Sequence, residues 1–360
     1  MTAPTAWARF ALPDGSEATE PAEHRGLARD GVRLLVAEPD RLRHVVFRDL
    51  PAVLRPGDLV VLNTSATLPA AVHGTVGGGR PVPVHVAAEL DDGSWVVEVR
   101  LGGGRGPDLS RRPGDVIVLP GGVELTLTAA YPDPERAPSR LWRARARSDQ
   151  DPAEAPGKDQ GQDRRAYLVR YGEPIRYSYL KWPLPLEQFQ TVYAGAAGSA
   201  ELVSAGRPFT DRLLTRLIGA GVMVAPLTLH TGVSSPDKHE PPAPEPYLVP
   251  PDTARLVNSA KGAGRRVVAV GTTVVRALET VATPTGEVVA GQGWTDLVLD
   301  ADRPARCVDG LITGLHEPQA SHLFLLESVA GPALVSAAYA AAVEQRYLWH
   351  EFGDSMLFLP

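Results

Sequence analysis

The sequence predicts a discontinuous α/β main domain that carries an inserted antiparallel β unit, either a small sheet or a barrel. A buried strand, a glycine turn and a helix follow one another in RRVVAVGTTVVRALE, from Arg265 to Glu279. Residues 69–147 instead alternate apolar and polar side chains around tight turns, which is typical of antiparallel strands. Helix and strand spacing then returns after a polar linker. We therefore expect the main domain to comprise 1–68 and 166–360, and the insert to comprise 69–165.

Composition limits the class of protein. The chain has 360 residues, 44% of them apolar and 22% charged, which is ordinary for a globular protein of one large domain or two. Its net charge of −6 argues against a uniformly basic surface for nucleic acid. The single cysteine, Cys307, excludes an intramolecular disulfide and a thiolate metal cluster. No apolar run has the length of a membrane span, and no export signal is visible, so we expect a cytoplasmic protein.

The first part of the main domain is expected to be rich in strands. We expect strands at 32–37 and 43–47, followed by a short helix that ends at Pro56-Gly57. A buried apolar strand at 59–62 comes next. The last strand runs directly into Asn63, a polar residue at the carboxyl end, where ligands gather in α/β sheets.

The insert is expected to have one face in contact with water. Residues 95–100, WVVEVR, alternate apolar and polar side chains, and so do the strands that follow. The last strand places Arg143, Arg145 and Arg147 on one face. This row either forms a solvated face or contacts a phosphate backbone.

After the insert, the pattern predicts alternating helices and strands. We expect a helix at 211–219 that Thr210 caps, and a strand at 222–229 that ends at His230. A proline-rich loop at 239–251 follows. We then expect a helix at 254–261, before the central strand, and a final helix at 331–347. In the central segment, Thr272 or Thr273 is expected to cap the helix that begins there.

Polar residues directly follow several predicted strands. Asn63, His230, Thr272 and His316 are the clearest cases, and strand ends of one sheet converge on one crevice. A histidine there serves as a general base or holds a carboxylate or ribose hydroxyl, unless it is structural. The helix that begins after Gly271 presents free backbone N–H groups to a carboxylate or phosphate. No spacing typical of metal ligands is present, so we expect no metal.

Several segments together resemble one family, and they occur in its order. They are QTVYA at 190–194, AGRPFTDRLL at 205–214, TLHTG at 228–232, VVAVGTTVVRALE at 267–279, GWTDLVL at 293–299, VDGLITGLHEP at 308–318 and FGDSMLF at 352–358. From about residue 29 to its C-terminus, the chain resembles the S-adenosylmethionine:tRNA ribosyltransferase-isomerases of the queuosine pathway. This resemblance implies an α/β domain that carries an inserted β-barrel.

The resemblance also implies the reaction. S-adenosylmethionine is the co-substrate, and its ribosyl part is transferred to the 7-deazaguanine base (preQ1) of tRNA and isomerised to give epoxyqueuosine, while adenine and methionine leave. A sulfonium acidifies the neighbouring C5′ hydrogens, so a positioned base can start the rearrangement without a metal. The resemblance thus implies a transferase and isomerase that acts in tRNA modification, in queuosine biosynthesis.

Site residues are carried over position by position. His230 and His316 are expected as the catalytic acid/base or polar groups, and Gly271, Thr272 and Thr273 as the binding site of the methionine carboxylate. Arg276 assists there or pairs on the surface. The other expected donor-binding residues are Asn63, Gln190, Thr191, Tyr193, which is otherwise a core residue, and Asp354, which contacts a ribose hydroxyl or caps a turn.

The sequence also departs from the family pattern. Thr64 and Ala66 replace an aspartate and an arginine, Pro208 replaces a histidine, and His350-Glu351 replace an aromatic–serine pair. These changes motivate an alternative, a paralogue that uses S-adenosylmethionine with a small-molecule acceptor or as a lyase or isomerase. A non-catalytic binding protein is a third hypothesis. The expected partners are S-adenosylmethionine and either tRNA or a small molecule, with no membrane, in a monomer or homodimer.

Overall fold

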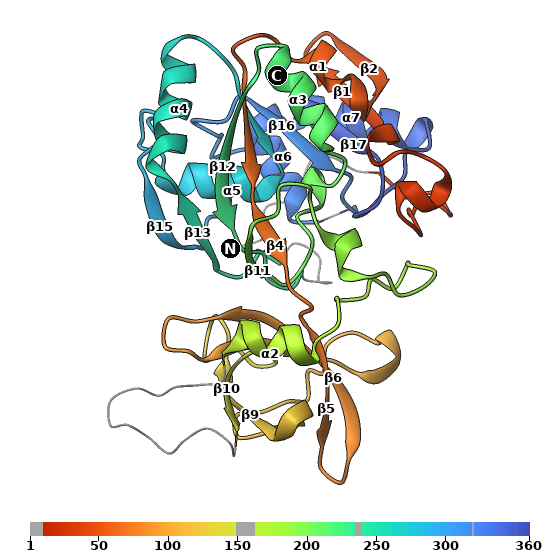
Figure 1. Cartoon of the computed structure of the whole chain (residues 1–360), viewed down its shortest axis with the longest axis vertical. Helices are drawn as coiled ribbons and strands as arrows, with labels where there is room; N and C mark the ends of the chain where they lie inside the picture. The colour runs from red at the N-terminus through yellow and green to blue at the C-terminus, as the bar shows by residue number, and fades with distance from the viewer. Residues whose placement is uncertain (1–9, 149–162, 235–239, 319) are drawn as a thin grey trace.

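The computed structural model describes residues 10–148, 163–234, 240–318 and 320–360. Its main body is a mixed sheet with helices on both faces, and a closed antiparallel barrel lies below that body in Figure 1. The predicted fold class is therefore confirmed. The barrel resolves the alternative between a sheet and a barrel that the strand pattern left open.

The main sheet has nine strands in the order β15-β13-β12-β3-β14-β16-β17-β1-β2. Four neighbouring strands at its centre, β12, β3, β14 and β16, run parallel, so their carboxyl ends share one edge of the sheet. The strands are β1 (Arg33–Glu38), β2 (Arg41–Val46), β3 (Leu59–Asn63), β12 (Met223–Leu229), β13 (Glu245–Val249), β14 (Val267–Val270), β15 (Gly291–Thr295), β16 (Gly310–Gly314) and β17 (Ser355–Phe358).

Both faces of this sheet are covered, because its central strands are apolar throughout. Leu59 and Val61 belong to the core under α4, α5, α6 and α7, whereas Val60 and Leu62 belong to the core under α1 and α3. The alternate side chains of one strand thus supply two cores. The helices are α1 (Leu50–Val53), α3 (Asp211–Gly219), α4 (Pro251–Gly262), α5 (Thr272–Val281), α6 (His322–Ala330) and α7 (Pro332–Glu344).

The barrel closes in the order β10-β7-β6-β5-β8-β9. Its alternation follows the prediction in β9, where Val123, Leu125 and Leu127 are buried and Glu124 and Thr128 are exposed. The strands are β5 (Ala71–Val76), β6 (Arg80–Glu89), β7 (Trp95–Val99), β8 (Val116–Leu119), β9 (Val123–Ala130) and β10 (Leu141–Ser148). Helix α2 (Arg164–Tyr171) lies on the barrel, and Tyr167 and Leu168 pack into its core.

The division of the chain at residues 68/69 and 165/166 remains a prediction. Helix α2 (Arg164–Tyr171) spans the second boundary, and it packs with the barrel. Between the two bodies, β4 (Ser65–Thr67) and β11 (Ala196–Ser199) form a short parallel pair (Figure 1). Side chains also join the bodies: Arg140 contacts Glu240 at 2.8 Å.

Two expectations about elements are wrong. The polar face of β7 is not wet, because Arg140 covers Glu98 and donates to it at 2.9 Å. The stretch expected as a proline-rich loop contains β13, whose edge pairs with β15. The predicted final helix corresponds to α7, and the sequence pattern did not predict the helix before it, α6.

Within the described residues, no single helix is long and apolar enough to cross a membrane. The pair α6 and α7 reaches that length and apolarity together, but it is bent by 118°.

Candidate active site

The predicted site residues come from neighbouring strands of the sheet. His230 follows β12, Asn63 ends β3, the helix start at Gly271 follows β14, and His316 follows β16. Because these four strands are parallel neighbours, their carboxyl ends present the residues along one edge. The strand after β3 leads into the barrel, so this edge is the one that faces it (Figure 1).

Asn63 holds this edge together. Its Nδ2 donates to the carbonyl oxygen of Leu229 at 2.8 Å and to Oγ1 of Thr273 at 3.1 Å. Its Oδ1 accepts from the backbone N–H groups of Ser65 and Leu229, both at 3.0 Å. A buried amide with four such bonds has no capacity left for a ligand. The expectation that Asn63 binds the donor therefore receives no support, since the residue joins β3, β12 and α5.

His230 ends a chain of hydroxyl groups. Its Nδ1 lies 2.7 Å from Oγ of Ser65, which lies 2.6 Å from Oγ of Ser199. Ser199 accepts from the backbone N–H of Thr231 at 2.9 Å. Every hydroxyl hydrogen finds an acceptor when Ser199 donates to Ser65 and Ser65 donates to Nδ1. His230 is then the tautomer that carries its proton on Nε2.

Two further observations concern His230. Burial, and secondarily the charge of Arg164, lowers its pKa to about 4, so the ring is neutral at neutral pH. Within the part of the chain that the structure describes, its Nε2 has no hydrogen-bond partner. Gly198 packs directly on the ring, since a Cβ there would lie 2.5 Å from Nδ1. The ring is thus fixed in place, with one nitrogen available.

The start of α5 is open, contrary to the predicted threonine cap. Gly271 is the N-cap residue, with φ 92° and ψ 154°, and no side chain caps the helix. Glycine is required because this φ is unfavourable for other residues. Thr273 uses its Oγ1 to accept from Asn63. The backbone N–H groups of Thr272 and Thr273 have no acceptor among the described residues, and they lie at the positive end of the helix dipole.

His316 is the most enclosed histidine at this edge. Its Nε2 lies 2.9 Å from Oγ1 of Thr313, and its ring stacks on His322 with the centroids 4.4 Å apart. Its backbone N–H and carbonyl contact Tyr339 and Trp349. Burial and the neighbouring histidines hold its pKa well below the usual range. The side chain is therefore neutral and held in position.

Arg276 does not face the open helix start. Its guanidinium is buried, pairs with Glu245, and donates to the carbonyl oxygens of Leu297 at 3.1 Å and Thr295 at 3.0 Å. Neither expectation for it, assistance at the carboxylate or a surface pair, fits these contacts. Arg276 instead joins α5 to the β13–β15 edge.

Asp354 and Gln190 are engaged in the same way. Asp354 accepts from the backbone N–H and the Nε of Arg33, at 2.8 and 3.0 Å, and from the N–H of Leu348 at 2.8 Å. Gln190 forms a pair of hydrogen bonds with the backbone of Thr67, at 3.0 and 2.8 Å. Both side chains are therefore held by protein partners, and any contact with a ribose hydroxyl or the adenosine would have to use the hydrogen-bonding positions that these bonds leave.

Thr191 and Tyr193 lie in the core beside the edge. The ring of Tyr193 packs edge-on against Phe209, 6.0 Å between centroids, and burial raises the pKa of its hydroxyl. Gly206 allows this approach, because a Cβ there would lie 2.0 Å from the Tyr193 hydroxyl. Oγ1 of Thr191 is buried without a partner in the described structure. The Tyr193 hydroxyl likewise makes no hydrogen bond among the described residues, so both residues retain a free polar atom.

A cleft of about 320 Å³ lies between the sheet edge and the barrel. We call it the interdomain cleft. His230 and Gly198 line it from the main domain, Glu89 from the end of β6, and Arg164 and Arg165 from α2. Sequence reasoning missed Glu89, Arg164 and Arg165. The arginines stand at the end of a stretch dismissed as a linker, where Asp163 caps α2 by accepting from the N–H of Ala166.

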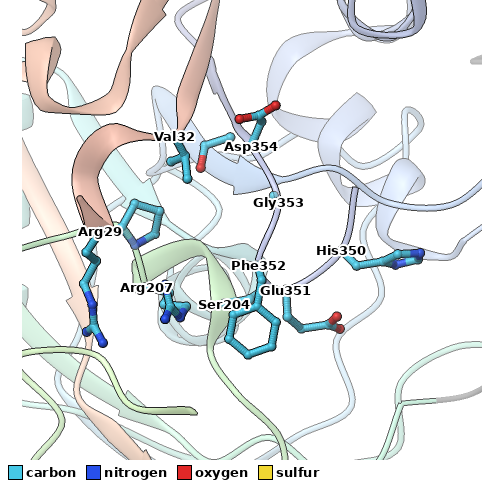
Figure 2. A pocket seen from close by; sticks show the side chains of 12 residues that line it. Arg29, Val32, Ser204, Arg207, His350, Glu351, Phe352, Gly353 and Asp354 are labelled. Carbon is cyan, nitrogen blue, oxygen red and sulfur yellow. The ribbon is translucent and has the colours of Figure 1, made fainter. Parts of the chain in front are cut away.

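A second pocket lies beside β17 and is much smaller, about 10 Å³, which is room for about one water molecule. We call it the C-terminal pocket. Figure 2 shows the side chains of His350 and Glu351 pointing away from Arg29 and Arg207. Oε2 of Glu351 is buried without a partner in the described structure, and burial raises the pKa of this carboxyl to about 7.

Among the described ranges, no cluster of three or more His, Cys, Asp and Glu side chains is placed to hold a metal ion. His239, the first residue of the stretch expected as a proline-rich loop, lies outside the described residues.

Comparisons with known proteins agree with one another. The profile of a family described as "Queuosine biosynthesis protein" matches residues 6–358. The chain is 37% identical to an S-adenosylmethionine:tRNA ribosyltransferase-isomerase of Thermus thermophilus, over 97% of this chain and 98% of that one. A relative of the same name from Moorella thermoacetica is 36% identical over the same shares. The crystal structure of an S-adenosylmethionine tRNA ribosyltransferase from Thermotoga maritima matches with a TM-score of 0.52 and 27% identity, over 98% of this chain and 100% of that one.

Proposed function

Since the chain belongs to the queuosine biosynthesis protein family, we propose that it is an S-adenosylmethionine:tRNA ribosyltransferase-isomerase. It transfers the ribosyl part of S-adenosylmethionine to the preQ1 base of tRNA and isomerises it, with release of adenine and methionine. Neither alternative, a small-molecule acceptor or a non-catalytic binding protein, gains support from the relatives, which share one name. A cytoplasmic location and independence of metal are part of the proposal.

The observation that carries a site assignment is the open start of α5 beside His230. Two backbone N–H groups without acceptors, at the positive end of a helix, suit the carboxylate at the methionine end of the donor. Asn63 fixes this start to the strand that precedes His230, because it bonds both Thr273 and Leu229. We therefore place the donor along this edge, with Thr272 and Thr273 at its carboxylate.

Two neutral histidines flank that position. His230 offers an Nε2–H donor, which suits a ribose hydroxyl or the departing adenine. His316 is the alternative acid/base group, held by Thr313. Because both pKa values lie below the ordinary value for histidine, neither ring changes its charge near neutral pH.

The proposal is tested by incubating the protein with S-adenosylmethionine, with and without preQ1-modified tRNA. We expect adenine and methionine to appear by chromatography only when the modified tRNA is present, together with a mass gain on the tRNA. Turnover with a small-molecule acceptor but not with tRNA would contradict the proposal and favour the paralogue hypothesis.

A further inference from the structure

We infer that the interdomain cleft binds the acceptor nucleobase, and that Glu89 reads the N–H edge of that base. This inference rests on the proposed function, since it assigns the acceptor side of the same reaction. The cleft adjoins His230, the only expected catalytic residue that lines it. A base held there would lie next to the donor position proposed at the start of α5.

The size and lining of the cleft favour a flat base. Its volume of about 320 Å³ is at the lower end of the range for small-molecule sites. Small and apolar side chains, among them Leu68, Ala88 and Pro246, form much of its wall, and charged groups stand at a few points only. A planar ring with one polar edge matches such a site, and an enzyme that modifies a base has to extract it from its stack.

Arg164 fixes the shape of the cleft. The residue is 6% exposed, and its guanidinium donates to the carbonyl oxygens of Gly198, Val86 and Ala87, each at 3.2 Å. It thus joins β11 of the main body to β6 of the barrel. Its Nε is buried and has no acceptor among the described residues. We assign it as a positioning residue that holds the two walls at a fixed separation.

Glu89 is the polar group best suited to select the base. It is exposed at the end of β6, and it makes no hydrogen bond or salt bridge within the described residues. A free carboxylate with two acceptor oxygens complements adjacent N–H groups, such as those on the edge of guanine and its deaza analogues. An adenine edge presents only one such amino group, so the same carboxylate favours the acceptor base over the adenine of the donor.

Arg165 stands at the rim, exposed, on the helix that closes the cleft. A cation at this position suits a phosphate beside the extracted base. Such a contact contributes equally to the binding affinity for RNA of any sequence. Glu89 and Arg165 therefore make separable predictions: Glu89 affects binding through the guanine-type edge of the base, and Arg165 affects the salt dependence of RNA binding.

The test compares Glu89→Gln with a matched control, Glu124→Gln, which makes the same change at an exposed position on β9 of the barrel. Binding of preQ1-modified tRNA and of the same tRNA with an unmodified guanine is measured at equilibrium, and binding of S-adenosylmethionine is measured by calorimetry. We also measure kcat/KM for the modified tRNA.

We expect Glu89→Gln to lower kcat/KM for the modified tRNA by at least about tenfold, mainly through KM, and to leave S-adenosylmethionine affinity within about twofold. Glu124→Gln should match the wild type. Arg165→Gln should weaken both tRNAs equally and reduce the salt dependence of binding by about one phosphate contact.

The inference is overturned if Glu89→Gln behaves like Glu124→Gln, or if it weakens S-adenosylmethionine binding as much as tRNA binding, since the cleft would then hold the donor. A wild-type protein that binds modified tRNA but releases no adenine would refute the proposed function alone. The effect of Glu89→Gln on tRNA binding would still decide the inference in that case.

Discussion

The interdomain cleft and the C-terminal pocket lie along the same sheet edge, but different polar groups in them are available. At the cleft, Nε2 of His230 has no partner among the described residues, and the N–H groups at the start of α5, on the same edge, also lack one. At the C-terminal pocket, Asp354 is engaged by Arg33 and Leu348, and Arg207 by Glu23 and Gln188. The first region offers a histidine nitrogen to a ligand. The second uses Asp354 and Arg207 to hold the fold, and its Glu351 oxygen without a partner in the described structure is buried.

This difference shows that residue type at a strand end locates a site but does not establish that a side chain is available. Availability depends on partners from distant segments. Substitutions in the two regions should therefore separate, because engaged groups affect stability and available groups affect turnover.

The largest effect is expected for Arg276, an engaged residue close to the cleft. Arg276→Met should lower the free energy of unfolding by about 3–5 kcal/mol, because it leaves the buried Glu245 without its counter-charge. Urea denaturation measures this change. The double variant Arg276→Met with Glu245→Gln should recover part of the loss. A stable Arg276→Met protein with weakened S-adenosylmethionine binding would mean that Arg276 contacts the donor instead.

Substitution of His230 should instead reduce turnover and leave the free energy of unfolding nearly unchanged. His230→Gln should reduce kcat by about 100-fold, because the Nε2–H is lost from the cleft, while the free energy of unfolding changes by less than about 1 kcal/mol. Turnover is followed by adenine release. Tyr193→Phe, which removes a hydroxyl from the neighbouring core, serves as a control and should retain activity. Unchanged turnover of His230→Gln would remove this residue from the mechanism.

Glu351 tests the C-terminal pocket through pH. Its folded-state pKa of about 7 lies above its ordinary value of 4.5, so between these values the folded protein keeps a proton that the unfolded chain loses. Stability should therefore fall as pH rises through this window. Glu351→Gln should match the wild type near pH 4.5 and be more stable by roughly 1–3 kcal/mol above pH 7. Urea denaturation at both pH values measures the difference; an equal difference at both would contradict the assignment.

The smallest effect is expected for the bond between Asn63 and Thr273. Thr273→Val should cost about 1 kcal/mol, because Nδ2 of Asn63 keeps its bond to Leu229. Thr273→Ser retains the hydroxyl and serves as the control. If the start of α5 binds the donor carboxylate through backbone N–H groups, both variants should keep S-adenosylmethionine affinity within a few-fold. A large loss with valine only would assign the contact to the hydroxyl.

Much of the fold follows from local pattern. The run Val267–Val270 is apolar on both sides because helices cover both faces of the sheet, and this can be recognised in the sequence. Strand β13 was missed because Pro246 argues against a strand, although at this position it faces Trp294 of β15. The buried face of β7 depends on Arg140, more than forty residues away, so alternation alone predicts it wrongly.

The sequence predicted which sheet edge carries the site, but not which of its side chains are already bound to protein partners. Strand order brings Asn63, His230 and Gly271 to one edge, as the polar residues after strands suggest. The engagement of Arg276 by Glu245 and of Asp354 by Arg33 depends on tertiary contacts that no local pattern contains. Glu89 and Arg164 line the same cleft because α2 packs on the barrel, where Arg164 donates to the carbonyl oxygens of Val86 and Ala87 on β6.

The most direct test of this account is a crystal structure of the protein with S-adenosylmethionine bound. We predict that the methionine carboxylate accepts from the backbone N–H groups of Thr272 and Thr273, with the side chains of Arg276 and Asp354 keeping their protein partners and the space beside Glu89 left for the acceptor. A donor bound in the C-terminal pocket against Arg207 and Glu351, with Asp354 released from Arg33, would contradict it.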